Sequence, residues 1–278
     1  MKIQYLGTGA AEGIPALFCE CDVCKMSRKI GGRSIRTRSQ ALIDDRLLID
    51  FPPDTYFHFI KYNIPMSKIK NCIVTHSHPD HLYTSDIKLR KKGYAHVDRK
   101  QPPLKFYSAE AGYKNILSAK ESGKISDEEI TVDRITPFET YKIDGYEITP
   151  LPANHSVYTS PVIYLIEKEG KSILYSHDTA EFPDETAEFL KKYKKPLGLV
   201  SLDCTHANTF LKKNGHLNLR ECASIKKDFI KWGTADDNTV FVLNHFSHNG
   251  KDVFYDDFVR IASEDGFEVS YDGLTICI

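Results

Sequence analysis

The chain contains 278 residues, with 37 basic and 38 acidic side chains, a formal net charge of −1, 41% hydrophobic residues and 27% charged residues. This composition excludes an intrinsically disordered chain. The charge balance argues against a protein that coats nucleic acid or an acidic membrane. Apolar runs reach only a few residues, so no segment is expected to span a membrane.

The organisation of the chain favours a single domain over residues 1–278, because no internal repeat and no Pro- or Gly-rich linker interrupts it. The amino-terminal segment MKIQYLGTG lacks the apolar core of a signal peptide, so we expect a cytoplasmic, reducing location. The seven cysteines are an odd number, and three of them lie together in the segment FCECDVC. This pattern favours a metal site over a disulfide framework.

The predicted secondary structure alternates between short strands and helices. In chain order, apolar runs predict strands within residues 2–9, 41–51, 71–76, 103–108, 146–152, 161–167, 172–178, 197–204 and 239–246. Capping patterns, acidic starts, basic ends and terminal glycines predict helices beginning at 126–129 and covering 183–196, 217–233 and 253–266. Strands interrupted by helices imply a layered α/β structure.

A glycine-rich segment, residues 7–13, follows the first predicted strand. It is one residue longer than the dinucleotide-binding fingerprint, and it places Glu12 where a pyrophosphate would lie. The segment therefore predicts a tight turn near the functional site rather than a nucleotide cofactor site.

The strongest motif is His76-Ser77-His78-Pro79-Asp80-His81, directly after the strand-like segment NCIVT. In extended backbone alternate residues face the same side, so His76 and His78 can converge on one metal ion. A turn at Pro79 would let Asp80 and His81 reach a second ion beside the first. Three imidazoles and a carboxylate within six positions predict a metal centre rather than a solvated polar loop.

The pattern HxHxDH resembles the signature of the metallo-β-lactamase superfamily. The resemblance implies an α/β fold that is a four-layer αββα sandwich, with the metals at one edge. It also implies three later ligands, each after a predicted strand: His155, Asp178 and His245. By this resemblance one ion takes His76, His78, His155 and Asp178, and the other takes Asp80, His81, Asp178 and His245.

Imidazole and carboxylate ligands suit two divalent ions of zinc, manganese or iron, among which the sequence does not choose. The water that the two ions share would have its pKa lowered from 15.7 to about 7, so the implied reaction is hydrolysis by a metal-bridging hydroxide. His177 precedes the bridging Asp178, and on a strand its side chain would face away from the metals. We therefore expect a structural role for His177.

Cys19, Cys21 and Cys24 form a CxCxxC cluster that needs a fourth ligand for a closed tetrahedral zinc site. His248, three residues after His245, is the best candidate. This combination is similar to the phosphoribosyl cyclic phosphate phosphodiesterases of the carbon–phosphorus lyase pathway. The resemblance implies a structural zinc that contributes on the order of 10 kcal/mol to folding; unliganded reduced thiols are the alternative.

His216 precedes a predicted helix. In the phosphodiesterases that the chain resembles, a histidine in this context donates a proton to the leaving alkoxide, a role worth roughly 10² to 10⁴ in rate. A surface histidine at a helix start is the alternative. A structural role is expected for His206, and none is assigned to His58 or His96.

Two groups of basic residues remain open to interpretation. Arg33, Arg36 and Arg38 could bind phosphate through their guanidinium groups, or could simply alternate along a solvated strand. The lysine-rich runs 88–92 and 191–195 are interpreted as solvated helix faces, since no aromatic residues alternate with them as in a platform for single-stranded nucleic acid.

The sequence thus predicts a metal-dependent hydrolase, a phosphodiesterase for a small cyclic phosphate or nucleotide-like diester, in which Asp80 and His216 take part in catalysis. The alternatives are a tRNA-processing type of endonuclease and, in another class, a non-catalytic metal-binding or sensor protein. The expected partner is a small phosphodiester substrate, with no membrane and no stable nucleic-acid complex; a homodimer is compatible with the sequence.

Overall fold

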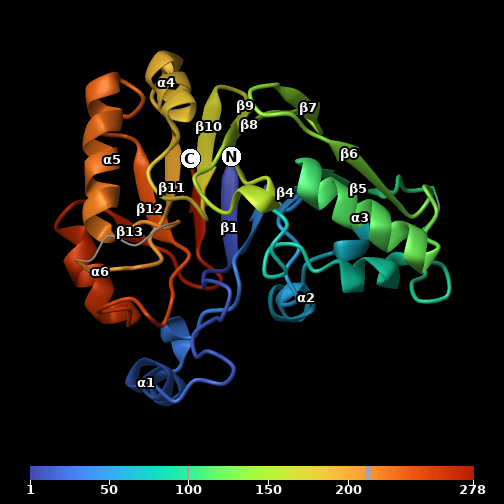
Figure 1. The fold of residues 1–278 in the computed structure, drawn as a ribbon, viewed down its shortest axis with the longest axis horizontal. Helices are drawn as coiled ribbons and strands as arrows, with labels where there is room; N and C mark the ends of the chain where they lie inside the picture. Colours follow the sequence, from blue (N-terminus) through green and yellow to red (C-terminus); the bar gives the residue numbers. More distant parts are fainter. Residues whose placement is uncertain (99, 211–214) are drawn as a thin grey trace.

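Two seven-stranded sheets face each other at the centre of the computed structural model, which describes residues 1–98, 100–210 and 215–278 (Figure 1). The first sheet has the order β14-β1-β2-β3-β4-β5-β6. Its strands are β1 (Lys2–Gly7), β2 (Gln40–Ile43), β3 (Leu47–Ile49), β4 (Asn71–Val74), β5 (Leu104–Ser108), β6 (Ile130–Arg134) and β14 (Thr275–Cys277).

The second sheet has the order β13-β12-β11-β10-β9-β8-β7. Its strands are β7 (Tyr141–Ile143), β8 (Tyr146–Pro152), β9 (Val162–Lys168), β10 (Lys171–Ser176), β11 (Leu199–Asp203), β12 (Val240–Asn244) and β13 (Glu268–Val269). Strands β10 to β13 pair in parallel, and β9 is antiparallel to both β8 and β10. The carboxyl ends of β8, β10, β11 and β12 therefore lie at one edge of this sheet.

Helices cover the outer face of each sheet (Figure 1). The second sheet carries α4 (Asp184–Tyr193), α5 (Leu219–Trp232) and α6 (Tyr255–Ser263), and the first carries α2 (Thr55–Tyr62) and α3 (Glu110–Gly123). A further helix, α1 (Asp22–Ile30), lies below the sheets, and short 3₁₀ turns occupy Gly32–Ser34, Met66–Lys68, Thr84–Arg90 and Val157–Thr159.

Three apolar cores separate these four layers. One core joins α4, α5 and α6 to the second sheet, one lies between the two sheets, and one joins the first sheet to α2 and α3. Alternation explains how one strand serves two cores: in β9, Tyr164 faces the first sheet, while Ile163 and Leu165 face the helices. The predicted four-layer αββα sandwich is confirmed.

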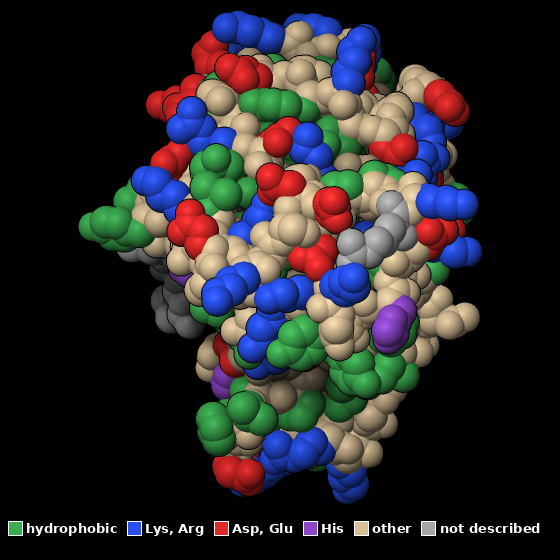
Figure 2. Space-filling model, turned by 90° about the vertical axis from the view of Figure 1, so that its right-hand side faces the viewer, with side chains coloured by type: hydrophobic (Ala, Val, Ile, Leu, Met, Phe, Trp, Pro, Cys, Tyr) green, Lys and Arg blue, Asp and Glu red, His purple; other side chains and the backbone are tan. Residues whose placement is uncertain are grey.

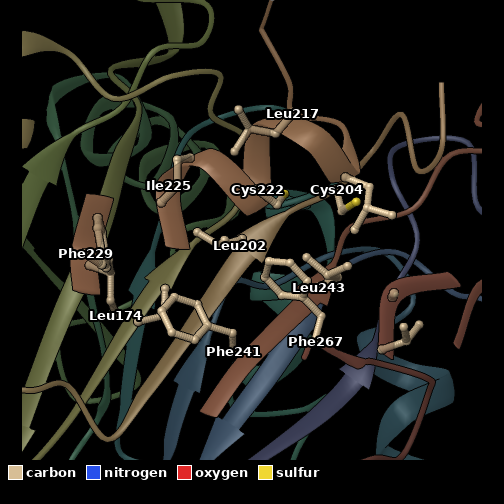
Figure 3. Packing of buried hydrophobic residues seen from close by; sticks show 14 of the residues in the cluster. Leu174, Leu202, Cys204, Leu217, Cys222, Ile225, Phe229, Phe241, Leu243 and Phe267 are labelled. Atoms are coloured by element: carbon tan, nitrogen blue, oxygen red, sulfur yellow. The ribbon is translucent and has the colours of Figure 1, made fainter. Parts of the chain in front are cut away.

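Packing between α5 and the second sheet is shown in Figure 3. Asn218 is the N-cap of helix α5: its side chain accepts a hydrogen bond from the backbone N–H of Glu221, and the Glu221 carboxylate accepts one from the backbone N–H of Asn218. Its buried face then lies on strands β10, β11 and β12, and the labelled side chains are Leu174, Leu202, Cys204, Leu217, Cys222, Ile225, Phe229, Phe241, Leu243 and Phe267. This packing fixes the carboxyl end of β11, where the candidate site lies.

One predicted helix is wrong. Ser126 donates from its backbone N–H and its hydroxyl to Glu129, as in a capping box, but residues 127–129 form only a turn. Strand β6 begins at Ile130 and pairs with β5, so the chain has no room for a helix there. None of the described helices combines the length and apolar composition needed to cross a membrane.

Candidate metal centre and catalytic pocket

Three histidines gather beside the carboxyl end of β4. His76 follows β4, and the turn at Pro79 closes through a hydrogen bond from the backbone N–H of His81 to the carbonyl of His78. Nδ1 of His78 lies 2.9 Å from Nε2 of His76 and 3.2 Å from Nε2 of His155, which comes from the loop after β8. The predicted ligands of the first ion thus meet from two different sheets.

A second group lies next to the first and is almost fully buried. Asp80, His81, Asp178 and His245 have ligand atoms within 4.8 Å of one another. Oδ2 of Asp178 lies 2.5 Å from Nε2 of His81 and 3.1 Å from Nε2 of His245. The same oxygen lies 3.7 Å from Nε2 of His76. Asp178 therefore stands between the two groups, where a bridging ligand would be.

The protonation pattern shows that this group suits a cation. Nδ1 of His81 lies 2.7 Å from Oδ2 of the buried Asp50, and Nδ1 of His245 lies 2.8 Å from the hydroxyl of Thr205. If both Nδ1 atoms donate there, both Nε2 atoms present lone pairs to Oδ2 of Asp178. All three atoms are buried without a hydrogen-bond partner among the described residues. Such lone pairs repel one another unless a positive charge lies between them, so the residues fit a divalent metal ion.

The electrostatic environment of His81 also favours positive charge here, carried either by a second proton on its ring or by a metal ion that displaces this proton. Burial alone would lower the pKa of His81, but the carboxylates of Asp178, Asp80 and Asp50 outweigh it and raise this pKa well above its ordinary value. Burial would likewise raise the pKa of Asp178, but His245 and His81 hold it well below its usual range. The pocket thus stabilises positive charge at the position where a metal ion is predicted.

Two of the predicted ligands have unusual backbone conformations. Asp178 has a φ of 51° and His245 a φ of 66°, both in the left-handed region that non-glycine residues seldom occupy. Asp178 lies two residues after the end of β10, and His245 immediately follows the end of β12. The turn redirects the side chain into the site, and strain of this kind concentrates at functional positions.

His216 faces the same pocket, and a buried aspartate that the motifs did not identify holds it there. Nδ1 of His216 lies 3.0 Å from Oδ2 of Asp203, the last residue of β11. Asp203 is fully buried and also accepts hydrogen bonds from the backbone of Leu217, Asp178 and Thr205. Burial lowers the pKa of His216, but the charge and hydrogen bond of Asp203 outweigh it and raise this pKa to about 9.

The pocket between these groups has a volume of about 340 Å³. Its lining combines the predicted ligands with groups from the amino-terminal loop and the loop after β12. These residues are Ala10, Ala11, Glu12, His78, Asp80, His155, Asp178, Thr205, His206, His216, His245, Ser247 and Asn249.

Cys19, Cys21, Cys24 and His248 form a separate cluster beyond this pocket, with ligand atoms within 4.8 Å of one another. The Sγ atoms of Cys19 and Cys21 each lie 3.5 Å from Nδ1 of His248. Tetrahedral zinc with Zn–S of about 2.3 Å and Zn–N of about 2.05 Å implies an S···N separation of about 3.5 Å. Hydrogen bonds with the Cys24 backbone and with His248 lower the pKa of Cys21 to about 6, which favours the thiolate that binds metal. These residues fit a zinc ion.

The remaining histidines are placed outside the ligand groups. His177 is buried against Tyr175, and its ring nitrogens lie 2.8 Å from the hydroxyl of Ser201 and 3.1 Å from Nδ2 of Asn244, which agrees with the structural role expected for it. His58 is buried between Gln40 and Thr37 and does not line the catalytic pocket. His206 lines the pocket, with its ring 5.7 Å from that of His216.

The arginines are engaged within the protein. Arg36 is buried, donates to Thr8 and to the carbonyl of Ser270, and lies over the ring of Phe246. Arg38 pairs with Asp54, and Arg33 lies over two tyrosine rings. None of the three lines the catalytic pocket, so phosphate binding by these arginines finds no support. Lysine-rich residues 88–92 lie partly in the exposed 3₁₀ turn Thr84–Arg90, and 191–195 include the end of α4.

The model of the beta-lactamase superfamily domain matches residues 45–235. The chain belongs to this superfamily. The metallo-β-lactamase resemblance seen in the sequence is thereby confirmed, and the chain is a metal-dependent hydrolase of this fold. A comparison of the sequence with curated proteins finds no match.

Three solved structures illustrate the likeness. A diphosphatase from the PhnP family is 23% identical, with a TM-score of 0.72 over 99% of this chain and 97% of that chain. Zinc-bound PqqB from Methylobacterium extorquens is 18% identical, with a TM-score of 0.76 over all of both chains. The short form of human tRNase Z is 16% identical, with a TM-score of 0.70 over 100% of this chain and 99% of that one. At these identities they show the fold alone.

Proposed function

We propose that the protein is a dinuclear metal-dependent phosphodiesterase that hydrolyses a small cyclic phosphate or a nucleotide-like diester. The observation that carries this proposal is the pair formed by His216 and Asp203. The imidazole of His216 faces the pocket, which is lined by members of both groups of predicted metal ligands. An alkoxide expelled from a phosphodiester is a poor leaving group and requires a proton donor at this position.

The first ion would be held by His76, His78, His155 and Asp178, and the second by Asp80, His81, Asp178 and His245. Two divalent ions, zinc, manganese or iron, would supply Lewis acidity and a nucleophile at neutral pH. The protein fixes the rest: Asp50 and Thr205 orient His81 and His245, and Asp203 orients His216 with its proton facing the pocket.

The charge distribution supports a small anionic substrate. The whole chain is near neutral, with a formal net charge of −1, and the predicted ions would concentrate positive charge at one edge. A pocket of about 340 Å³ suits a mononucleotide-sized molecule. One structural neighbour is named a diphosphatase and another a tRNase, and both names denote enzymes that act on phosphate-containing substrates.

The tRNase neighbour favours one second candidate, a tRNA-processing type of endonuclease. The near-neutral net charge opposes stable nucleic-acid binding. A non-catalytic metal sensor is the candidate of another class, but every ligand position that the superfamily signature requires is filled.

The cysteine cluster with His248 is proposed to hold one structural zinc.

A homodimer is the proposed assembly, and the exposed side of α2 is the surface that supports it: Tyr56, Phe57, Phe59 and Ile60 are exposed there. Figure 2 shows hydrophobic side chains gathered in the lower half of this side of the molecule, below a band of Lys and Arg side chains.

The test is metal analysis of the purified protein followed by turnover of cyclic and linear phosphodiesters with zinc, manganese or iron supplied. We expect two ions per pocket, hydrolysis of small diesters and loss of at least 100-fold in rate in Asp80→Ala. A wild-type protein that binds two ions and hydrolyses no diester would refute the phosphodiesterase. Faster cleavage of a tRNA precursor than of any small diester would favour the endonuclease instead.

A further inference from the structure

Among the described residues that line the pocket, Glu12 is the carboxylate that is neither a predicted metal ligand nor hydrogen-bonded to His216. It lies in the glycine-rich turn after β1 and lines the catalytic pocket together with the predicted ligands. Its side chain is 32% exposed, so solvent and substrate can reach it. A carboxylate in the wall of a pocket for anions weakens the binding of any anionic group placed beside it, and its presence therefore calls for an explanation.

The turn that carries Glu12 is fixed against the segment that carries His245. The backbone N–H of Ala10 donates to the carbonyl of Phe246, and the N–H of Phe246 donates to the carbonyl of Thr8. Gly13, with a φ of 68°, closes the turn through a hydrogen bond to Ala10. The backbone of Glu12 thus has a set position relative to the catalytic pocket.

The side chain of Glu12 is held through only one of its two oxygens. Oε1 accepts hydrogen bonds from the hydroxyl of Ser247 at 2.6 Å and from Nδ2 of Asn249 at 3.2 Å. The same oxygen lies 3.5 Å from Nε2 of His248, whose Nδ1 faces the cysteine cluster. Oε2 accepts no hydrogen bond from the residues that the structure describes.

From this arrangement we propose that Glu12 determines substrate specificity by accepting a hydrogen bond from a hydroxyl group of the substrate through its second oxygen. The inference rests on the phosphodiesterase proposed above and names its substrate class: a diester whose retained group carries a hydroxyl beside Glu12 and no second phosphate there. A charged acceptor held in place binds a hydroxyl donor strongly, and it repels a phosphate at the same position.

The contacts of Glu12 with Ser247 and Asn249 would need no charge. Ser247 and Asn249 both donate, so a neutral glutamine could accept from them through its amide oxygen. The negative charge is needed only where it meets a stronger demand, such as a substrate hydroxyl or the imidazole of His248. The variant Glu12→Gln separates these roles because it keeps the shape and removes the charge.

The experiment compares three diesters that share the p-nitrophenolate leaving group and so require little proton donation from His216. These are bis(p-nitrophenyl) phosphate, thymidine 5′-(p-nitrophenyl phosphate), which has a free 3′-hydroxyl, and the same compound with a 3′-phosphate. For each variant kcat/KM is measured on all three, with zinc content and Tm as measures of the cysteine cluster.

We expect the wild type to prefer the 3′-hydroxyl ester to the 3′-phosphate ester. In Glu12→Gln the ratio of kcat/KM for the hydroxyl ester to that for bis(p-nitrophenyl) phosphate falls about 10- to 100-fold, the worth of one hydrogen bond to a charged group. Rejection of the 3′-phosphate weakens as well. Glu20→Gln removes a charge from the same loop at a side chain 76% exposed and outside the pocket, and it should keep the wild-type ratios.

The outcomes are distinguishable. If Glu12→Gln changes kcat/KM on all three substrates by one common factor, or lowers zinc content and Tm without altering the ratios, Glu12 is structural and the inference is wrong. If the wild type hydrolyses none of the three diesters with metal bound, the proposed phosphodiesterase function is wrong.

Discussion

Replacing Asp203 with asparagine tests the predicted proton donor while every predicted metal ligand is kept. Asp203 lies at the end of β11, fully buried, with Oδ2 3.0 Å from Nδ1 of His216. Asparagine has nearly the same shape, so the backbone hydrogen bonds to the carboxylate from Leu217 and Thr205 can be kept by its amide oxygen. The variant removes the negative charge that opposes the effect of burial on His216.

The expected magnitude follows from the pKa of His216, about 9 in the native protein. At pH 7.5 such a group is about 97% protonated, whereas at an ordinary histidine pKa of 6.5 it is about 9% protonated. Protonation alone therefore lowers the rate about 10-fold, and the lost orientation adds to this, within the roughly 10² to 10⁴ that a general acid is worth. Because His216 acts in its protonated form, the decline of kcat at high pH should move from near pH 9 to near or below pH 6.5.

The assay compares a diester that expels an alkoxide, such as a 3′,5′-cyclic nucleotide, with one that expels p-nitrophenolate. Asp203→Asn should slow the first at least 10-fold more than the second at pH 7.5, since p-nitrophenolate leaves without a proton. Tm and metal content serve as controls. Equal losses on both substrates, or an unchanged pH profile, would refute the assignment of His216 as proton donor.

Three further predictions concern the metal sites and stability. Cys21→Ser should remove one zinc per chain and lower Tm by roughly 10 °C, measured by metal analysis and calorimetry; unchanged zinc content would contradict the structural site. Asp50→Asn should weaken binding of one metal ion about 10- to 100-fold in a chelator competition, because Asp50 orients His81; equal affinity would show that the hydrogen bond is dispensable. Burial lowers the pKa of His58 to about 4, so the unfolded chain binds more protons between pH 6.5 and 4, and stability falls as the pH falls through this window. In urea unfolding the wild type should lose about 2 kcal/mol more than His58→Asn between pH 7 and 5.

The sequence names the proposed metal ligands because each group lies where local pattern is informative, and the structure brings their ligand atoms together in two groups. His76, His78, Asp80 and His81 are within six positions, so their spacing alone indicates a shared site. The later ligands each follow an apolar run that forms a strand of one sheet, β8, β10 or β12. Strand order then brings them to one edge, and the αββα layers follow from the same alternation of strands and helices.

Asp203 and Asp50 were missed because their role depends on tertiary partners. Each ends or directly follows an apolar strand, just as the ligands do, and this position is the signal that could have identified them. The motif itself gives no reason to choose an aspartate 13 residues before His216 or 31 residues before His81. Their importance becomes visible only when burial and the facing imidazole are known.

The helices that were not predicted have weak apolar patterns. Helix α1 begins inside the cysteine cluster, with Cys21 as its N-cap residue, and its buried residues are Cys24 and Ser27, so it has no buried apolar stripe that the sequence could reveal. Helix α2 leaves large apolar side chains exposed on the surface, which obscures the helical period. The mistaken helix at 126–129 shows the opposite error: the capping residues are present, but the chain enters β6 at once.

The predicted zinc site at the cysteine cluster and the predicted catalytic metal site share one short segment, which carries both His248 and His245. This makes the two sites dependent on each other. His245 and His248 are separated by Phe246 and Ser247, and Phe246 is fully buried and hydrogen-bonded through its backbone to Thr8 and Ala10. A chain held so tightly between its two ligands cannot let His248 move without shifting His245. Loss of zinc from the cysteine cluster in Cys21→Ser should therefore weaken the ion held with His245 more than the ion held by His76, His78 and His155. Chelator competition on that variant measures the affinities for both catalytic ions. If both affinities equal those of the wild type, the segment does not couple the sites.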